Sequence, residues 1–203
     1  MKNVLIINSS LNGSAGNSNQ LTASFVSQLQ QQAEVKLTQR DLYDANLPHL
    51  SSEEMQAWMT DKSERSEEQQ QLAAVSDQLI EEIQQSDIVV IGMPMYNFGV
   101  PSVFKAWIDR IARAGITFRY TENGPQGLIE GKKVYVLAAR GGLYVGTEKD
   151  SQSQYLKDVL SFIGMSDIEF VYAEGLAMGE ESAQQSFVQA NDKIFELIEK
   201  QIA

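Results

Sequence analysis

Five short apolar runs alternate with longer amphipathic segments along the chain. Residues 4–7 and residues 88–92 are uninterrupted apolar runs, which is typical of strands covered on both faces. Residues 35–38, 134–138 and 168–172 are rich enough in β-branched and apolar residues to form three more strands. We therefore expect five strands, each followed by a helical segment.

The segments between these strands carry apolar residues at helical spacing. The five stripes are Leu21, Phe25 and Leu29; Leu72, Val75, Leu79 and Ile83; Phe104, Trp107, Ile108 and Ile111; Tyr155, Leu156, Val159, Leu160 and Ile163; and Phe187, Ile194 and Ile198. Asn17 with Gln20, and Ser182 with Gln185, have the spacing of capping boxes, so we expect the first and last helices to begin there. Gly164 is expected to end the fourth helix.

This alternation predicts an α/β fold with a parallel sheet, right-handed crossovers and helices on both faces. Five strands favour the doubly wound order 2-1-3-4-5 over the six-stranded dinucleotide-binding fold. No segment has the composition of a linker, so residues 1–203 are expected to form a single domain. Residues 41–67 and 115–132 are longer than ordinary loops, and we expect them to cover a site or to contact a second subunit. Within the second, residues 116–121 alternate like a strand before turn residues 123–125.

Composition excludes several classes of function. The chain has 16 Lys and Arg against 27 Asp and Glu, a formal net charge of −11, so we expect no nucleic acid or anionic membrane as a partner. It has no cysteine and one histidine, His49, so we expect no metal site built on thiolates or histidines. No apolar run approaches the roughly 20 residues of a membrane span, and the N-terminus lacks a signal-peptide pattern. We expect a soluble cytoplasmic protein whose redox chemistry, if any, uses a bound cofactor.

Ligands of open parallel sheets bind beyond the carboxyl ends of the strands, and three loops of this chain begin at such ends. Residues 8–18 are rich in hydroxyls and lead into a helix N-terminus, which suits either a phosphate or an ordinary capped loop. Residues 94–98 bring two aromatic rings and an amide, which either stack on a planar ligand or cap the core. Residues 140–142 include two glycines, which either admit a flat ring or form a turn.

The chain resembles a known family most closely in residues 94–98, 112–125 and 140–142, and the resemblance extends over nearly its whole length. The family is that of the FMN-dependent NADH azoreductases, also described as NADH:quinone oxidoreductases. The resemblance implies a flavodoxin-like fold, bound FMN, NADH as the electron donor, and a quinone or an aromatic azo compound as the acceptor. It also implies a homodimer with its sites at the subunit interface.

The resemblance assigns one set of positions to FMN and another to the substrate. The FMN positions are Ser10, Gly16, Asn17, Ser18, Met95, Tyr96, Asn97, Phe98, Ala139, Arg140, Gly141 and Gly142. Phe118 and Tyr120 are expected to wall the pocket over the flavin. Compared with the family, Ala139 lacks a serine hydroxyl and residues 16–18 replace a more hydroxyl-rich phosphate loop, so we expect weaker FMN binding with the backbone N–H contacts kept.

The expected mechanism needs no catalytic side chain, because the flavin N5 position accepts hydride from NADH and then passes it to the acceptor. Turnover is expected to be ping-pong, since both substrates stack on the same flavin face. An alternative is a flavodoxin-type carrier of single electrons, which the acidic surface suits but the long connections do not. A second alternative is a binding module without FMN. A Ser-His-Asp hydrolase is not favoured, because His49 lies in a turn-like segment and no nucleophile elbow is present.

Overall fold

The apolar runs form the strands of one parallel sheet. The computed structural model describes residues 1–202. The strands of the sheet are β1 (Lys2–Asn8), β2 (Val35–Asp41), β3 (Ile88–Pro94), β6 (Lys133–Ala139) and β7 (Asp167–Ala173). Their order is β2-β1-β3-β6-β7, which confirms the expected order 2-1-3-4-5. β3 lies at the centre and is buried along its whole length, because an all-apolar strand has no face to turn toward water.

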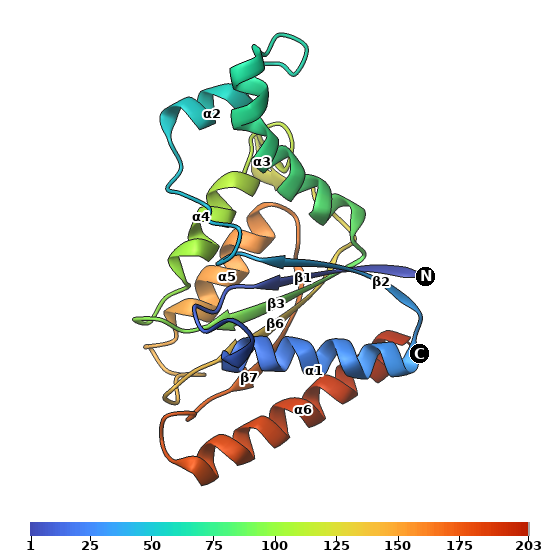
Figure 1. Ribbon diagram of the computed structural model, residues 1–203, viewed down its shortest axis with the longest axis vertical. Helices are drawn as coiled ribbons and strands as arrows, with labels where there is room; N and C mark the ends of the chain where they lie inside the picture. Colours follow the sequence, from blue (N-terminus) through green and yellow to red (C-terminus); the bar gives the residue numbers. More distant parts are fainter. Residues whose placement is uncertain (203) are drawn as a thin grey trace.

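Helices cover both faces of this sheet. They are α1 (Asn17–Gln32), α3 (Glu67–Gln85), α4 (Ser102–Ile111), α5 (Ser151–Phe162) and α6 (Glu180–Ile202), while α2 (Ser52–Met59) lies further from the sheet, against α3 (Figure 1). In Figure 1, α1 and α6 lie below the sheet, and α3, α4 and α5 lie above it. Each layer has its own apolar core: Phe25 and Ile194 belong to the lower one, and Leu79, Trp107 and Leu160 to the upper one. The doubly wound path of the crossovers stays a prediction.

The predicted capping box at the start of α1 is wrong. The N-cap position is Gly16, Asn17 is the first helical residue, and no side chain caps the helix. The side-chain amide of Gln20 donates instead to the carbonyl oxygen of Ala15, at 3.1 Å. The first turn of α1 therefore keeps its N–H groups free of side-chain caps.

The prediction for the start of α6 is also wrong, whereas that for the end of α5 is confirmed. α6 begins at Glu180, two residues before Ser182, and the hydroxyl of Ser182 donates to the carbonyl oxygen of Gly175, at 3.0 Å. Gly164 directly follows the C-cap of α5 with φ of +107°, a conformation that glycine adopts without steric cost.

The first long connection contains a helix, α2, that the analysis of hydrophobic spacing missed. Its N-cap is Ser51, whose hydroxyl accepts a hydrogen bond from the N–H of Glu54, at 3.1 Å. Ser51 and Glu54 have the spacing of a capping box, so this signal was present in the sequence. α2 packs on α3 through Ala57, Trp58 and Ala73.

The second long connection contains a β-hairpin, as its alternating pattern predicts. Its strands are β4 (Phe118–Thr121) and β5 (Gly124–Gly127), so β4 starts later than expected and β5 takes up part of the expected turn. A Cβ atom at Gly127 would clash with the backbone of Gly164, so the hairpin rests directly on the C-terminal end of α5.

The part of the chain that the structure describes contains no membrane-spanning helix and no metal cluster. None of its helices combines the length and the apolar character needed to cross a bilayer. Within residues 1–202, no three His, Cys, Asp or Glu side chains lie close enough together to hold a metal ion.

A buried ion pair ties α2 to α4. The Nε and Nη2 atoms of Arg110 donate to the two carboxylate oxygens of Glu54, both at 2.7 Å. Arg110 is only 1% exposed. Removing one partner of such a pair leaves the other charge buried and uncompensated.

We predict that Glu54→Ala lowers the free energy of unfolding by about 3 kcal/mol, because Arg110 then has no counterion. Urea titration followed by circular dichroism measures this loss. Glu53→Ala is the matched control at the neighbouring exposed position, and we expect it to leave the transition nearly unchanged. Equal midpoints for the two variants would contradict the structural role of the ion pair.

Candidate cofactor site

The loops that follow β1, β3 and β6 meet at one edge of the sheet. These strands are adjacent and parallel, so their carboxyl ends lie side by side, at the left of Figure 1. The Oη atom of Tyr96 lies 3.4 Å from the hydroxyl of Ser10 and accepts from the N–H of Leu11, at 3.2 Å. The N–H of Met95 donates to the carbonyl oxygen of Ala139, at 3.1 Å. The three stretches that the sequence singled out therefore form one site.

The loop after β1 leaves the N-terminus of α1 open. α1 has no side-chain cap and no acidic residue in its first turn, whereas α2 and α3 have serine caps and glutamates there. Among the described residues, no acceptor takes the backbone N–H groups of Asn17, Ser18 and Asn19. Free N–H groups at the positive end of a helix dipole suit a phosphate.

Ser10 and Gly16 set the shape of this loop. The hydroxyl of Ser10 accepts from the N–H of Asn12, at 3.2 Å, and Ser10 is 2% exposed. A Cβ atom at Gly16 would clash with that hydroxyl, so the chain can fold back over Ser10 only with glycine at this position. Residues 8–19 contain no Lys or Arg. To bind a phosphate, the loop therefore depends on its backbone shape and on neutral donors.

The loop after β3 is a tight turn with an aromatic ring on its surface. The N–H of Tyr96 donates to the carbonyl oxygen of Gly99, at 3.1 Å, and the N–H of Gly99 donates back, at 2.9 Å. Asn97 and Phe98 have φ of 49° and 64°, as the central residues of a type I′ turn require. Phenylalanine is uncommon in this conformation, and strain of this kind clusters at ligand sites. Phe98 is 52% exposed.

The side chain of Arg140 points away from the site and into the protein. It is fully buried and donates to Gln152 Oε1 at 3.3 Å, Ser153 Oγ at 2.8 Å and Glu174 Oε1 at 3.1 Å. Its Nη2 atom also lies 3.0 Å from the carboxylate of Asp150. All three nitrogens of the guanidinium therefore have partners within the protein, and the side chain positions the loops.

Two partners of Arg140 also form hydrogen bonds with the neighbouring loops. The amide of Gln152 donates to the carbonyl oxygens of Pro94, at 3.0 Å, and Gly99, at 2.9 Å. The carboxylate of Glu174 accepts from the N–H of Tyr144, at 2.9 Å, and of Val145, at 3.1 Å. Sequence reasoning missed both partners, because no local spacing connects them to the site.

The glycine pair after β6 offers backbone donors. The carbonyl oxygens of Gly141 and Gly142 accept from the N–H groups of Ala177 and Gly175, both at 3.0 Å. Within residues 1–202, no acceptor takes the N–H groups of the two glycines themselves. A Cβ atom at Gly142 would lie 2.8 Å from the Oη atom of Tyr144, so an aromatic ring already lies close to this backbone.

The structure does not bring Phe118 and Tyr120 to the three loops of their own chain. Phe118 is 8% exposed and packs on Phe162, with ring centroids 4.3 Å apart. The hairpin rests at Gly164, beyond the C-terminal end of α5, whereas Gln152 at the other end of α5 contacts the turn after β3. The 12 residues of α5 span about 18 Å. Phe118 is therefore a core residue, and only Tyr120, 74% exposed, is free to meet a ligand or a partner.

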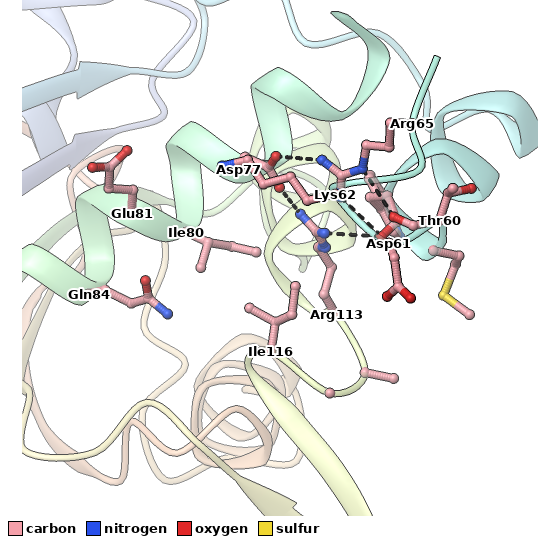
Figure 2. Close-up of a pocket in the computed structure, with 14 residues that line it drawn as sticks. Thr60, Asp61, Lys62, Arg65, Asp77, Ile80, Glu81, Gln84, Arg113 and Ile116 are labelled. Carbon is pink, nitrogen blue, oxygen red and sulfur yellow. Dashed lines mark hydrogen bonds and ion pairs between the residues drawn. The ribbon is translucent and has the colours of Figure 1, made fainter. Parts of the chain in front are cut away.

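A cavity of about 660 Å³ lies elsewhere, between α3, the end of α2 and residues 113–116 (Figure 2). Arg65 and Arg113 line it, and both donate to the carboxylate of Asp77 and to the carbonyl oxygen of Trp58. Burial alone would raise the pKa of Asp77, but hydrogen bonds from both arginines hold it below its ordinary value. Because these arginines already pair with the protein, the cavity is not the candidate site.

The parallel sheet and its three loops define a flavodoxin-like protein, and the family model described as "Flavodoxin-like fold" matches residues 2–198. Two relatives are both named FMN-dependent NADH:quinone oxidoreductase. The one from Pseudoalteromonas atlantica is 53% identical over 198 residues and 98% of each chain. The one from Alteromonas mediterranea is 55% identical over 197 residues, which are 97% of this chain and 98% of the other.

Solved structures with the same fold include azoreductases. An azoreductase from Bacillus anthracis str. Sterne is 26% identical, with a TM-score of 0.89 over 98% of this chain and 100% of the other. An FMN-dependent NADH-azoreductase from Bacillus anthracis str. Ames Ancestor, solved in complex with FMN, is 25% identical, with a TM-score of 0.88 over 100% of each chain. The chain belongs to the FMN-dependent NADH:quinone oxidoreductase family, which confirms the resemblance found in its sequence.

The acidic partners of Arg140 depend on its charge. Burial alone would raise the pKa of Asp150, but hydrogen bonds from Arg140 and Ser153 and the nearby positive charge hold it below its ordinary value of 3.8. A carboxyl with a lowered pKa in the folded state stabilises the fold above its unfolded pKa. That contribution is lost as the pH falls through the lower pKa of the folded state.

We predict that Arg140→Met lowers the free energy of unfolding at pH 7 by about 3 kcal/mol, because it leaves Asp150 and Glu174 without their cation. The difference from the parent protein should shrink as the pH falls from 3.8 through the lower pKa of Asp150 in the folded parent, because the carboxylate that pairs with Arg140 is then protonated. Urea titrations at several pH values measure both effects. Arg119→Met, at an exposed position of β4, is the control and should change little. A variant as stable as the parent at pH 7 would refute the role of Arg140.

Proposed function

We propose that this chain is a single-domain, FMN-dependent oxidoreductase that passes hydride from NADH to quinones and reductively cleaves aromatic azo compounds. One observation carries the proposal: an uncapped helix N-terminus, an exposed aromatic turn and a glycine pair converge at one edge of the sheet. They do so in a chain 53% and 55% identical to relatives named FMN-dependent NADH:quinone oxidoreductase. The neighbours named azoreductase support azo compounds as a second class of acceptor.

The donors at this edge suit FMN. The N–H groups of residues 17–19 and the hydroxyls of Ser10 and Ser18 would hold its phosphate. The turn at residues 95–98 and the N–H groups of the glycine pair would flank its ring. Ala139 has no hydroxyl to offer, but its carbonyl oxygen still fixes the turn through Met95. When bound, FMN supplies the position that accepts and donates hydride, and the chain binds and orients it.

We further propose a homodimer in which the hairpin of one subunit covers the site of the other. Tyr120 is exposed but belongs to a hairpin that rests at the far end of α5 from the loops of its own chain, so it would reach only the flavin of a second copy. Leu11, Phe98, Leu143 and Val145 are exposed around the loops and would be covered by such a contact.

A single-electron carrier is not favoured, because the relatives and the structural neighbours are named as enzymes that use NADH or reduce azo compounds. NADH is preferred to NADPH in the proposal because the net charge of −11 disfavours an additional phosphate. The cytoplasmic location stays a prediction.

We predict ping-pong turnover, because the donor and the acceptor share one flavin face at one edge of the sheet. The purified protein should be yellow, NADH should bleach its flavin absorbance, and double-reciprocal plots at several quinone concentrations should be parallel. Intersecting lines would rule out a shared site. A protein that takes up no FMN would overturn the proposed function, and a yellow protein that NADH cannot reduce would favour the carrier.

We predict that Gly141→Val loses FMN without unfolding. The φ of Gly141 lies outside the left-handed region, and a Cβ atom there would lie 3.3 Å from the Cβ of Ala177, a tight contact that a shift of a few tenths of an ångström in the loop of Ala177 would relieve. A branched side chain beside the flavin ring would weaken FMN binding roughly tenfold or more. Flavin absorbance per mole of protein measures occupancy, and circular dichroism reports folding. His49→Ala, at an exposed position, is the control. Full occupancy in folded Gly141→Val would refute this placement of the glycine pair.

A further inference from the structure

The ring of Tyr144 lies between two loops of the candidate site, and we call the space between these loops the slot. It packs edge-on against Phe98, with ring centroids 5.6 Å apart and 75° between the ring planes. On its other side, the Oη atom of Tyr144 lies 2.8 Å from the position of a Cβ atom at Gly142. One phenol ring therefore connects the turn after β3 to the glycine pair after β6, the two walls proposed to flank the flavin.

The backbone of Tyr144 is held firmly without help from its ring. Its N–H donates to the carboxylate of Glu174, and its carbonyl oxygen accepts from the N–H and the hydroxyl of Thr147, at 2.9 and 2.8 Å. No hydrogen bond to the hydroxyl of Tyr144 is formed within residues 1–202. A side chain on a fixed backbone, held only by van der Waals contacts, can change rotamer while the loop keeps its shape.

The environment of Tyr144 differs from that of its neighbours. Leu143 and Val145 are 61% and 46% exposed, whereas Tyr144 is partly covered by its contacts with the two loops. The ring belongs to neither of the two large apolar cores of the sheet. Packing of the core therefore does not explain its position.

We propose that Tyr144 is a flavin-binding side chain that, together with Phe98, closes the slot and must turn aside for FMN to enter or leave. The proposal rests on the proposed function, because it concerns the same cofactor. FMN lying along the backbone of Gly142 cannot avoid the ring of Tyr144, because that ring already lies against this backbone. An aromatic pair across the opening slows FMN release, since both rings must separate from the ligand and from each other.

The test measures release of FMN from the flavin-loaded protein. The holoprotein is diluted, and the rise in flavin fluorescence gives the dissociation rate constant. Tyr144→Ala should release FMN roughly tenfold faster, through loss of the aromatic contacts. Tyr144→Phe should release it at nearly the parental rate, because no hydrogen bond to the hydroxyl is lost. His49→Ala, at an exposed position outside the three loops, is the control and should also match the parent.

The coupling of the two rings gives a second measurement. Phe98→Ala should also accelerate release, and the double variant Phe98→Ala/Tyr144→Ala should be no faster than the faster single variant, because the rings act as one unit. The melting temperature of the FMN-free protein should be the same in Tyr144→Ala and the parent. If Tyr144→Ala does not fold, Tyr144→Leu tests the same loss of aromatic contact.

The outcomes distinguish this inference from the proposed function. A parent protein that binds no FMN overturns the proposed function. A parent that binds FMN, with Tyr144→Ala or Tyr144→Leu releasing it at the parental rate, overturns only the role of Tyr144. A lower melting temperature with an unchanged release rate also overturns it, because the ring would then serve only to pack the loop.

Discussion

The buried guanidinium of Arg140 is the interaction on which the candidate site depends. A cation with no exposure is stable in the fold only because Asp150 and Glu174 neutralise it and Gln152 and Ser153 complete its hydrogen bonds. The same partners hold the turn after β3 and the segment after the glycine pair. Because each partner lost would leave the buried guanidinium with fewer hydrogen bonds or less compensating charge, this network fixes the loops more tightly than apolar contacts alone would.

The pattern of apolar residues was sufficient to predict the sheet and the edge at which the site lies. A strand such as β3, covered by helices on both faces, contains only apolar residues, and parallel strands necessarily bring their carboxyl ends together. The partners of Arg140 could not be predicted in this way, because Glu174 lies 34 residues further along the chain, on another strand end. The start of α1 was mispredicted because a good capping pattern at Asn17 competes with the requirement for glycine at position 16.

The resemblance to a family identified Phe118 and Tyr120 but could not say which of them is exposed and which lies in the core. Both residues lie on the same face of β4, as their spacing of two requires. Phe118 nevertheless lies against Phe162 in the core, while Tyr120, further along the strand, extends beyond it. Local periodicity predicts the two faces of a strand. It does not predict where along the strand the core ends, and this boundary falls between Phe118 and Tyr120.

The features that make this edge suitable for a cofactor also lower the stability of the folded protein when no cofactor is bound. An uncapped helix N-terminus leaves backbone donors without partners, and a phenylalanine in the left-handed conformation is strained. A ligand that accepts hydrogen bonds from residues 17–19 and packs on Phe98 offsets both costs, and it does so only in the folded state. Stability and cofactor binding are therefore linked at this edge, because a ligand that binds only the folded chain shifts the unfolding equilibrium toward it. The hydrogen bonds around Arg140 hold the loops in place without a ligand, so the candidate site is formed by the protein alone.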